Sequence, residues 1–347
     1  MVTDEAQTFK TPNTRTSHAL KAIHPDFHIA CTGTPVENRL LDVWNILDAV
    51  QPSLLGTARD FKKRYESESG ESGGLDELRE RLHYQRPTAF LLRREKSIVG
   101  GFPLKHVRTL ECAMGSEEVD RHIGLLRALH KADKQKGIHL ACLHELVNLY
   151  QHPLAQDPEF DELPVEDLVA SSSKLQAAIA CLESIQTKGE KVIIFARHIR
   201  IQRMLARVLG HRFGISIDIL HGETPSKVGR SPVGQDAARS QRARILQRFK
   251  DRDGFHVLVL SPFVAGVGLT ITEANHVIHY GRWWNPAVES QATDRVYRIG
   301  QEREVHVHLP ILKDHSGRLP ATLDERIHDL LNRKQSLASD FLNPGST

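Results

Sequence analysis

Between residues 171 and 310, short runs of β-branched and other apolar residues alternate with segments whose apolar residues recur at helical spacing. The strand-like runs cover residues 192–195, 215–220, 256–260, 276–280 and 305–309. Helical spacing between them is carried by Ile201, Leu205, Val208 and Leu209, by Ile245, Leu246 and Phe249, and by Ala292, Val296 and Ile299. Strands that alternate with helices build right-handed crossovers. We therefore expect one α/β domain with a mostly parallel sheet that is covered by helices on both faces.

The first hundred residues carry a weaker form of this pattern. A short apolar lead reaches Asp4 and Glu5, a second apolar run reaches residues 32–35, and helical periodicity follows over 36–50. This predicts the back half of a second α/β unit, with its front strands missing from the sequence. The predicted organisation is a truncated first unit, a helical insertion, a complete second unit and a C-terminal helical extension, over residues 1–105, 106–170, 171–312 and 313–347.

Composition excludes several classes of protein. Apolar residues make up 40% and charged residues 26%, which is typical of globular domains and not of disordered chains. The 46 Lys and Arg residues against 43 Asp and Glu residues leave a net charge of +3, which by itself does not indicate nucleic-acid binding. The four cysteines lie far apart without a CxxC pair, which argues against a zinc ribbon or a disulfide scaffold. Because the longest apolar runs are strand-sized and no signal peptide is visible, we expect a cytoplasmic protein that does not enter a membrane.

Two carboxylates, Asp4 and Glu5, directly follow the first apolar lead. The carboxyl ends of parallel strands are where ligands bind in open sheets. One carboxylate there can hold Mg²⁺ while its neighbour orients a water for phosphoryl transfer. Taken alone, a pair of this kind is much more often a solvated acidic turn.

Two arginines, Arg295 and Arg298, are spaced to lie on one face of a helix that Gly300 would end. Two guanidinium groups side by side suit the charge of a transferring phosphoryl group. The alternative is a surface helix in which Asp294 and Glu302 are their partners.

Three further features have an ordinary structural explanation beside a functional one. Residues 261–270 follow a strand and contain Gly266 and Gly268, so they form either a phosphate-binding loop or a tight turn. His306 and His308 alternate on a strand, and without a third ligand in view we expect surface or edge residues rather than a metal site. A basic cluster over residues 239–250 is either a track for a phosphate backbone or a solvated helix face.

Taken in order, these segments resemble the motifs of the Swi/Snf-like ATPases, the double-stranded DNA translocases of helicase superfamily two. The DEAQ of residues 4–7 is similar to the DEAx box, and the TGTPVEN of residues 32–38 is similar to TGTPxxN. The remaining motif-like segments are 44–65, 90–94, 191–196, 220–222, 261–272, 284–286 (WNP) and 291–301 (QATDRVYRIGQ, similar to QAxDRxxRxGQ). The resemblance implies RecA-like parallel sheets of the P-loop NTPase type, with one complete C-terminal helicase lobe, a truncated first lobe and a helical insertion.

The resemblance also implies roles for individual residues. Asp4 would ligate Mg²⁺ and Glu5 would position the attacking water, while Gln291 would sense the nucleotide and Arg295 and Arg298 would act as arginine fingers. The other residues implied in nucleotide binding are Gln7, Gly266, Gly268 and Asp294. Those implied in coupling or DNA binding are Thr32, Gly33, Thr34, Pro35, Arg197, His221, Ser261, Thr270, Trp284 and Asn285. The expected cofactors are Mg²⁺ and ATP, and the expected partner is double-stranded DNA.

The sequence departs from the family in four places. Tyr297 stands where many members carry His, Arg282 and Trp283 precede WNP where many have an acidic residue, and the loop over 225–241 is long. The largest departure is that no GxxxxGK[ST] phosphate loop occurs in residues 1–347. We therefore expect the C-terminal part of a motor, which alone hydrolyses ATP negligibly. The alternatives are a non-enzymatic DNA-binding remnant, or one half of a split motor whose partner chain or upstream segment carries the phosphate loop.

Overall fold

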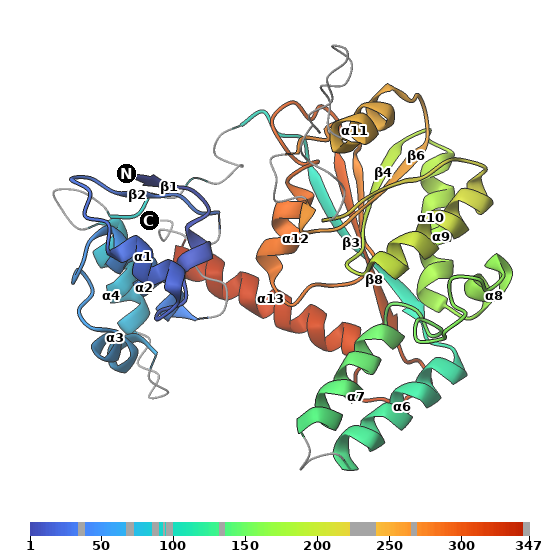
Figure 1. The fold of residues 1–347 in the computed structure, drawn as a ribbon, viewed down its shortest axis with the longest axis horizontal. Helices are drawn as coiled ribbons and strands as arrows, with labels where there is room; N and C mark the ends of the chain where they lie inside the picture. Colours follow the sequence, from blue (N-terminus) through green and yellow to red (C-terminus); the bar gives the residue numbers. More distant parts are fainter. Residues whose placement is uncertain are drawn as a thin grey trace, which may run out of the picture. The chain divides into compact units, whose positions relative to one another are not determined.

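The protein forms two compact units (Figure 1). The computed structural model describes residues 1–33, 39–66, 73–84, 90–92, 94, 100–131, 136–222, 241–264 and 269–342. Unit 1 comprises Met1–Val99, Asn285–Ala287 and Leu330–Thr347, and unit 2 comprises Gly100–Trp284 and Val288–Asp329. No helix in the described part of the chain is both long enough and apolar enough to cross a membrane.

Unit 2 is built on a six-stranded sheet in the order β3-β8-β7-β4-β6-β5, in which every neighbouring pair is parallel. The strands are β3 (Lys105–Ala113), β4 (Lys191–Phe195), β5 (Asp218–Leu220), β6 (His256–Leu260), β7 (His276–His279) and β8 (Val305–Lys313). Five of these coincide with the strand-like runs of the sequence. The predicted α/β fold class with a parallel sheet is therefore confirmed.

Helices cover both faces of this sheet, as the continuous apolar strands require. Alternation along β4 sends Val192 and Ile194 into one core and Ile193 and Phe195 into the other. The first core is closed by α8 (Val165–Ala170), α9 (Ser173–Gln186) and α10 (Ile199–Phe213), and the second by α11 (Gln241–Asp251) and α12 (Pro286–Thr293). In Figure 1, α9 and α10 lie on one side of the sheet and α12 on the other.

The segment predicted as a helical insertion opens with a strand, and there the helical prediction was wrong. β3 pairs along all nine residues with β8, from Lys105 opposite Val305 to Ala113 opposite Lys313. Its side chains are mostly exposed or half-buried, so it lacks the apolar run that marks the inner strands. The rest of the segment is helical, with α6 (Ser116–Lys131), α7 (Lys136–Leu149) and α8. The domain boundaries proposed from the sequence stay predictions.

Unit 1 contains a two-stranded parallel sheet and several helices. β1 (Val2–Thr3) pairs with β2 (Ile29–Ala30), as the two apolar runs predict. The other elements are the 3-10 helix η1 (Ala6–Phe9), α1 (Arg15–Lys21), α2 (Leu40–Val50), α3 (Ala58–Tyr65) and α4 (Gly73–His83). A further helix, α13 (Leu323–Leu342), begins in unit 2, and its residues from Leu330 onward are counted with unit 1.

Candidate functional site

In unit 1, strand pairing brings the DEAQ and TGTP segments together. The amide of Cys31 donates to the Thr3 carbonyl at 2.8 Å, and the amide of Ala6 donates to the Cys31 carbonyl at 2.9 Å. The residues that follow β1 and β2 therefore leave the sheet side by side. Glu5 turns the chain with a left-handed φ of 50° and leads directly into η1.

Gln7 joins the two segments through its side chain. Its Nε2 donates to Glu5 Oε2 at 2.5 Å, while its Oε1 accepts from Thr32 Oγ1 at 2.7 Å. Both ends of one amide are thus used, so Thr32 and the Glu5 carboxylate are linked through a single side chain. Gly33 follows Thr32 and is exposed.

The carboxylates of this unit suit a magnesium ion held mainly by its substrate. Asp4 is exposed, and its Oδ1 accepts a 2.9 Å hydrogen bond from the Glu5 amide, which orients the carboxylate. No group of three or more His, Cys, Asp or Glu side chains is arranged to hold a metal among the described residues. Mg²⁺ in phosphoryl-transfer sites typically takes one or two carboxylates and completes its shell with phosphates and water. A single oriented carboxylate at Asp4 fits that requirement.

In unit 2, three of the candidate residues follow the carboxyl ends of neighbouring strands. Arg197, His221 and Ser261 come after β4, β5 and β6 respectively. Backbone hydrogen bonds extend this edge, from Ala196 to the Leu260 carbonyl at 3.0 Å and from Ser261 to the Leu220 carbonyl at 2.8 Å. The structure therefore gathers these three residues at the sheet edge where ligands bind in open α/β folds.

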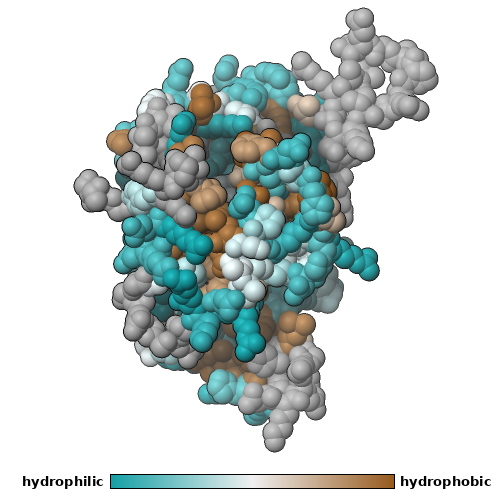
Figure 2. Space-filling model, turned by 90° about the vertical axis from the view of Figure 1, so that its left-hand side faces the viewer, coloured by the Kyte–Doolittle hydropathy of each residue, from teal (hydrophilic) through white to brown (hydrophobic). Residues whose placement is uncertain are grey.

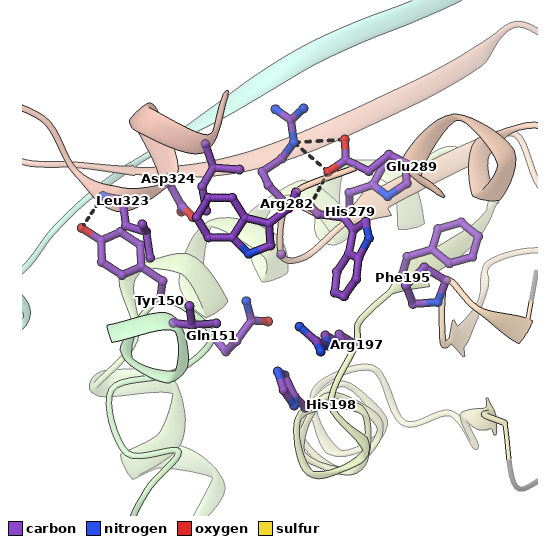
Figure 3. Close-up of a pocket in the computed structure, with 16 residues that line it drawn as sticks. Tyr150, Gln151, Phe195, Arg197, His198, His279, Arg282, Glu289, Leu323 and Asp324 are labelled. Atoms are coloured by element: carbon purple, nitrogen blue, oxygen red, sulfur yellow. Dashed lines mark hydrogen bonds and ion pairs between the residues drawn. The ribbon is translucent and has the colours of Figure 1, made fainter. Parts of the chain in front are cut away.

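A pocket opens at this edge, between the ends of the strands and the start of α13 (Figure 3). Arg197 lies at the pocket with its Cζ 4.3 Å from the centroid of the Trp283 ring, a cation–π contact that fixes the guanidinium. Gln151 reaches in from the end of α7 and lies against Gly281, where a Cβ would approach its Nε2 to 2.4 Å. The other lining residues are Val147, Tyr150, Phe195, His198, Pro262, His279, Arg282, Trp284, Glu289, Leu323, Asp324 and Ile327.

The positive charge of the pocket comes from arginine rather than histidine, and its two carboxylates, Glu289 and Asp324, are paired with Arg282 and Lys174. Burial lowers the pKa of His279, whose Nε2 lies 2.8 Å from the Thr293 hydroxyl. Burial also lowers the pKa of His198, and the adjacent Arg197 lowers it further. His198 is the N-cap residue of α10 but makes no capping hydrogen bond with its side chain. The positive end of this helix and the Arg197 guanidinium together favour an anion such as a phosphate.

Two local interactions hold the WNP segment, residues 284–286. The Oδ1 of Asn285 accepts a 3.0 Å hydrogen bond from the Ala287 amide, and Pro286 is the first residue of α12. Asn at the N-cap followed by Pro is a strong helix start. Just before it, Arg282 and Glu289 form a buried ion pair with Nε–Oε1 3.0 Å, and Glu289 also accepts from the Trp283 amide. Arg282, which departs from the family pattern, thus has a partner on α12.

The prediction that Arg295 and Arg298 share one helix face was wrong. α12 ends at Thr293, and residues 294–300 form turns. In this turn the Arg295 carbonyl accepts the Ile271 amide at 2.9 Å, which ties the turn to the segment before β7. Arg295 is half-buried and Arg298 is exposed, so the two guanidinium groups have different surroundings.

Gln301 fixes the far end of this turn segment and was missed from the sequence as a site residue. Its side chain is buried, and its Nε2 donates to the carbonyls of Thr272 and Ala274 at 3.0 and 2.8 Å. Its Oε1 accepts from the Arg303 amide at 3.0 Å. The segment after Thr270 and the arginine-bearing turn are therefore tied into one structure. The final Gln of QAxDRxxRxGQ was the signal that could have revealed this role.

The remaining candidates divide into three groups. Gln291 and Asp294 are half-buried near the end of α12, and Trp284 is 44% exposed. Thr34, Pro35, Gly266 and Gly268 lie outside the described residues. His308 is buried on an inner strand and hydrogen-bonds His276 at 3.0 Å, so the expectation of a surface or edge residue was wrong for it.

Comparison with known proteins agrees with both halves of this description. Residues 1–151 match the SNF2-related domain, and residues 173–300 match the helicase conserved C-terminal domain. The chain is similar to the Sulfolobus solfataricus SWI2/SNF2 ATPase core solved in complex with double-stranded DNA, with 30% identity and a TM-score of 0.52. That similarity covers 98% of this chain and 68% of the solved one. The chain therefore belongs to the SNF2 family of helicase-like ATPases.

Curated relatives extend the comparison. The chain is 35% identical over 358 residues to the Zorya protein ZorD of Escherichia coli O139:H28, covering 99% of this chain and 31% of that protein. It is 33% identical over 348 residues to YwqA of Bacillus subtilis, named as an ATP-dependent helicase/translocase, covering 98% of this chain and 35% of YwqA. The chain thus spans about a third of the length of these relatives.

Proposed function

We propose that residues 1–347 supply the catalytic carboxylates, the arginine fingers and the DNA-contacting edge of an ATP-driven translocase on double-stranded DNA. The observation that carries this proposal is the hydrogen-bonded path from Glu5 through Gln7 to Thr32. A motor must couple the state of its nucleotide to its grip on DNA. A direct link between a water-positioning carboxylate and the TGTP segment is what such coupling requires.

In unit 1, Asp4 would hold Mg²⁺, whose chemistry is to neutralise charge on the β- and γ-phosphates of bound ATP. Glu5 would orient and deprotonate the attacking water, and its bond from Gln7 keeps the carboxylate aimed. Gln7 would also contact the nucleotide. Thr32, Gly33, Thr34 and Pro35 would pass the change to the DNA-binding surfaces.

In unit 2, Arg295 and Arg298 would stabilise the phosphoryl group in the transition state, an effect worth about 10³–10⁵ in rate for arginine fingers. Gln291, Asp294, Gly266 and Gly268 would contact the nucleotide. Phosphates of one DNA strand would be held at the sheet edge by Arg197, His221, Ser261 and Thr270. Trp284 and Asn285 would also contact the DNA. The Arg197 guanidinium stacked on Trp283 and the start of α10 support an anion at this edge.

We also propose that residues 1–347 do not hydrolyse ATP alone, because they contain no GxxxxGK[ST] sequence to anchor the β- and γ-phosphates. The test is ATP hydrolysis with double-stranded DNA, first by this polypeptide alone. A second polypeptide that carries GxxxxGK[ST] and the front strands of an SNF2 first lobe is then added. We expect no turnover alone and DNA-stimulated turnover in the mixture.

Two variants sharpen this test. Glu5→Gln in the mixture should abolish turnover, whereas Glu159→Gln, at an exposed carboxylate of unit 2, should leave it unchanged. Turnover by residues 1–347 alone would contradict the proposed dependence on the phosphate loop. DNA binding that ignores ATP, together with no turnover in the mixture, would instead favour a non-enzymatic DNA-binding remnant.

A further inference from the structure

The segment at the start of unit 2 contains two adjacent glycines in the left-handed region. Gly100 and Gly101 have φ values of 72° and 73°, which residues with a Cβ rarely adopt. They stand at the point in the sequence where unit 1 gives way to unit 2. They precede Phe102 and Lys105, two residues of unit 2 that contact Tyr297.

Two residues that follow these glycines contact the aromatic ring of Tyr297. The ring of Phe102 lies 5.4 Å from that of Tyr297, centroid to centroid, with the planes tilted by 45°. The Nζ of Lys105 lies 5.2 Å from the centroid of the same Tyr297 ring. The segment itself is anchored to the sheet, because the Leu104 carbonyl accepts the Val305 amide at 2.9 Å.

Tyr297 lies between the two arginines of the turn that follows α12. The amide of Tyr297 donates to the Thr293 carbonyl at 2.9 Å, and the Arg298 amide donates to the Val296 carbonyl at 3.1 Å. Gln301 ties the far end of the turn to the neighbouring loop. The turn is therefore fixed on one side by Gln301 and on the other by the Phe102 and Lys105 side chains.

We infer that Tyr297 is a positioning residue for Arg295 and Arg298, and that Phe102 and Lys105 form a clamp that holds the turn carrying these arginines. The inference rests on the proposed role of the two arginines as fingers. The contacts of Phe102 and Lys105 with Tyr297 do not depend on that role. Removing the clamp should loosen the turn over 294–301 while the sheet stays intact.

Hydrogen exchange of the full 347-residue chain tests the clamp without any catalysis. Phe102→Ala should raise the exchange rate over residues 295–298 by about ten-fold, since an aromatic pair contributes roughly 0.5–1.5 kcal/mol and 1.4 kcal/mol is a factor of ten. Phe102→Tyr, which keeps the ring, should restore the slow exchange. Ile299→Ala, at a side chain that is 77% exposed in the same turn, should change it little.

A peptide containing the buried β7 strand reports global unfolding in the same experiment. If Phe102→Ala also speeds exchange there, Lys105→Met becomes the deciding variant. It removes only the cation above the ring and should raise exchange over 295–298 by about two- to five-fold. If a variant keeps exchange slow in β7 and also leaves exchange over residues 295–298 unchanged, the inference is overturned. An effect of Ile299→Ala equal to that of the clamp variant would overturn it too.

The ATPase mixture gives a second readout that separates positioning from mere stability. Because arginine fingers act in the transition state, Phe102→Ala should lower kcat about ten-fold or more and leave the KM for ATP nearly unchanged. A rise in KM at constant kcat would contradict a positioning role. Absence of turnover in the mixture that contains the unchanged 347-residue chain would refute the proposed function, whereas the exchange result would still decide whether the clamp exists.

Discussion

Four histidine rings form a continuous stack on one face of the unit 2 sheet. Ring centroids lie 5.1 Å apart for His106 and His306, 4.9 Å for His306 and His276, and 5.4 Å for His276 and His308. Glu190 lies 2.7 Å from the Nε2 of His276, on the side away from His308. A proton added to one ring places a positive charge beside the neighbouring rings, so charge repulsion opposes protonation of the stack.

We predict that this stack makes the protein sensitive to acid. Burial, followed by the charges of His276 and His306, lowers the pKa of His308 to about 4, while burial lowers the pKa of His276 and of His306 despite Glu190 nearby. A histidine whose pKa is depressed by folding favours the native state above its unfolded pKa of about 6.5. That stability is lost as the pH falls towards 4. For His308 the loss is at most about 3 kcal/mol between pH 7 and pH 4.

The measurement is urea unfolding of the 347-residue chain as a function of pH. His308→Gln keeps a donor near His276 but cannot titrate, so its stability should fall less steeply between pH 6.5 and pH 4. The matched control is His211→Gln, at an exposed position of α10, which should keep the full pH dependence. Equal slopes for His308→Gln and the unchanged chain would rule out the stack as the cause.

The role of a residue was predictable from the sequence where the residue belongs to a motif. It was not predictable where the role depends on a contact with a distant part of the chain. Asp4, Glu5 and Thr32 follow directly from their motifs. The link through Gln7 requires the pairing of strands some 27 residues apart, which only the fold supplies. The stack that contains His308 brings together histidines from β3, β7 and β8, and Glu190, the residue before β4, contacts His276.

At the scale of elements, α13 begins with a capping box. The Glu325 amide donates to Thr322 Oγ1 at 3.2 Å, and the Thr322 amide donates to Glu325 Oε2 at 2.8 Å. The Thr322 hydroxyl also donates to the Leu312 carbonyl at 2.6 Å, which ties the helix start to the end of β8. Because Thr322 is fully buried, water cannot replace these hydrogen bonds.

We therefore predict that Thr322→Val lowers the free energy of unfolding by about 2–3 kcal/mol, the sum of a lost N-cap and a buried hydrogen bond left unmade. Thr322→Ser keeps the hydroxyl and should cost less than about 1 kcal/mol. Chemical denaturation of both variants makes the comparison. A Thr322→Val variant as stable as Thr322→Ser would show that the methyl packing, and not the cap, holds this helix start.

Elements were predictable where the sequence has a clear period. The inner strands β4, β6 and β7 are continuous apolar runs, because both of their faces are buried. β3 escaped prediction because, among the residues that the structure describes, it is an edge strand whose partner β8 lies about 200 residues away. α12 was predicted too long because the helical spacing of apolar residues continues past Thr293, where the structure has turns.

At the scale of the whole molecule, the two units differ in how well their sheets are covered. The six strands of unit 2 are packed on both faces by helices. In unit 1 the sheet has two strands, and Val2 and Phe27 beside it are 68% and 71% exposed. Hydrophobic side chains lie among hydrophilic ones on the surface shown in Figure 2. Two-stranded sheets are marginal in water, and their open edges attract other strands.

This difference predicts an order of proteolysis. A broad-specificity protease should cut within residues 1–50 first, because the core around Ala6, Phe9 and Ile46 is small. The strands of unit 2 should persist, since opening them exposes two large cores. Mass spectrometry of timed digests identifies the cuts, and adding the polypeptide with the front strands of a first lobe should protect residues 1–50. A first unit as resistant as the six-stranded sheet, with or without that addition, would show that its small sheet needs no further strands.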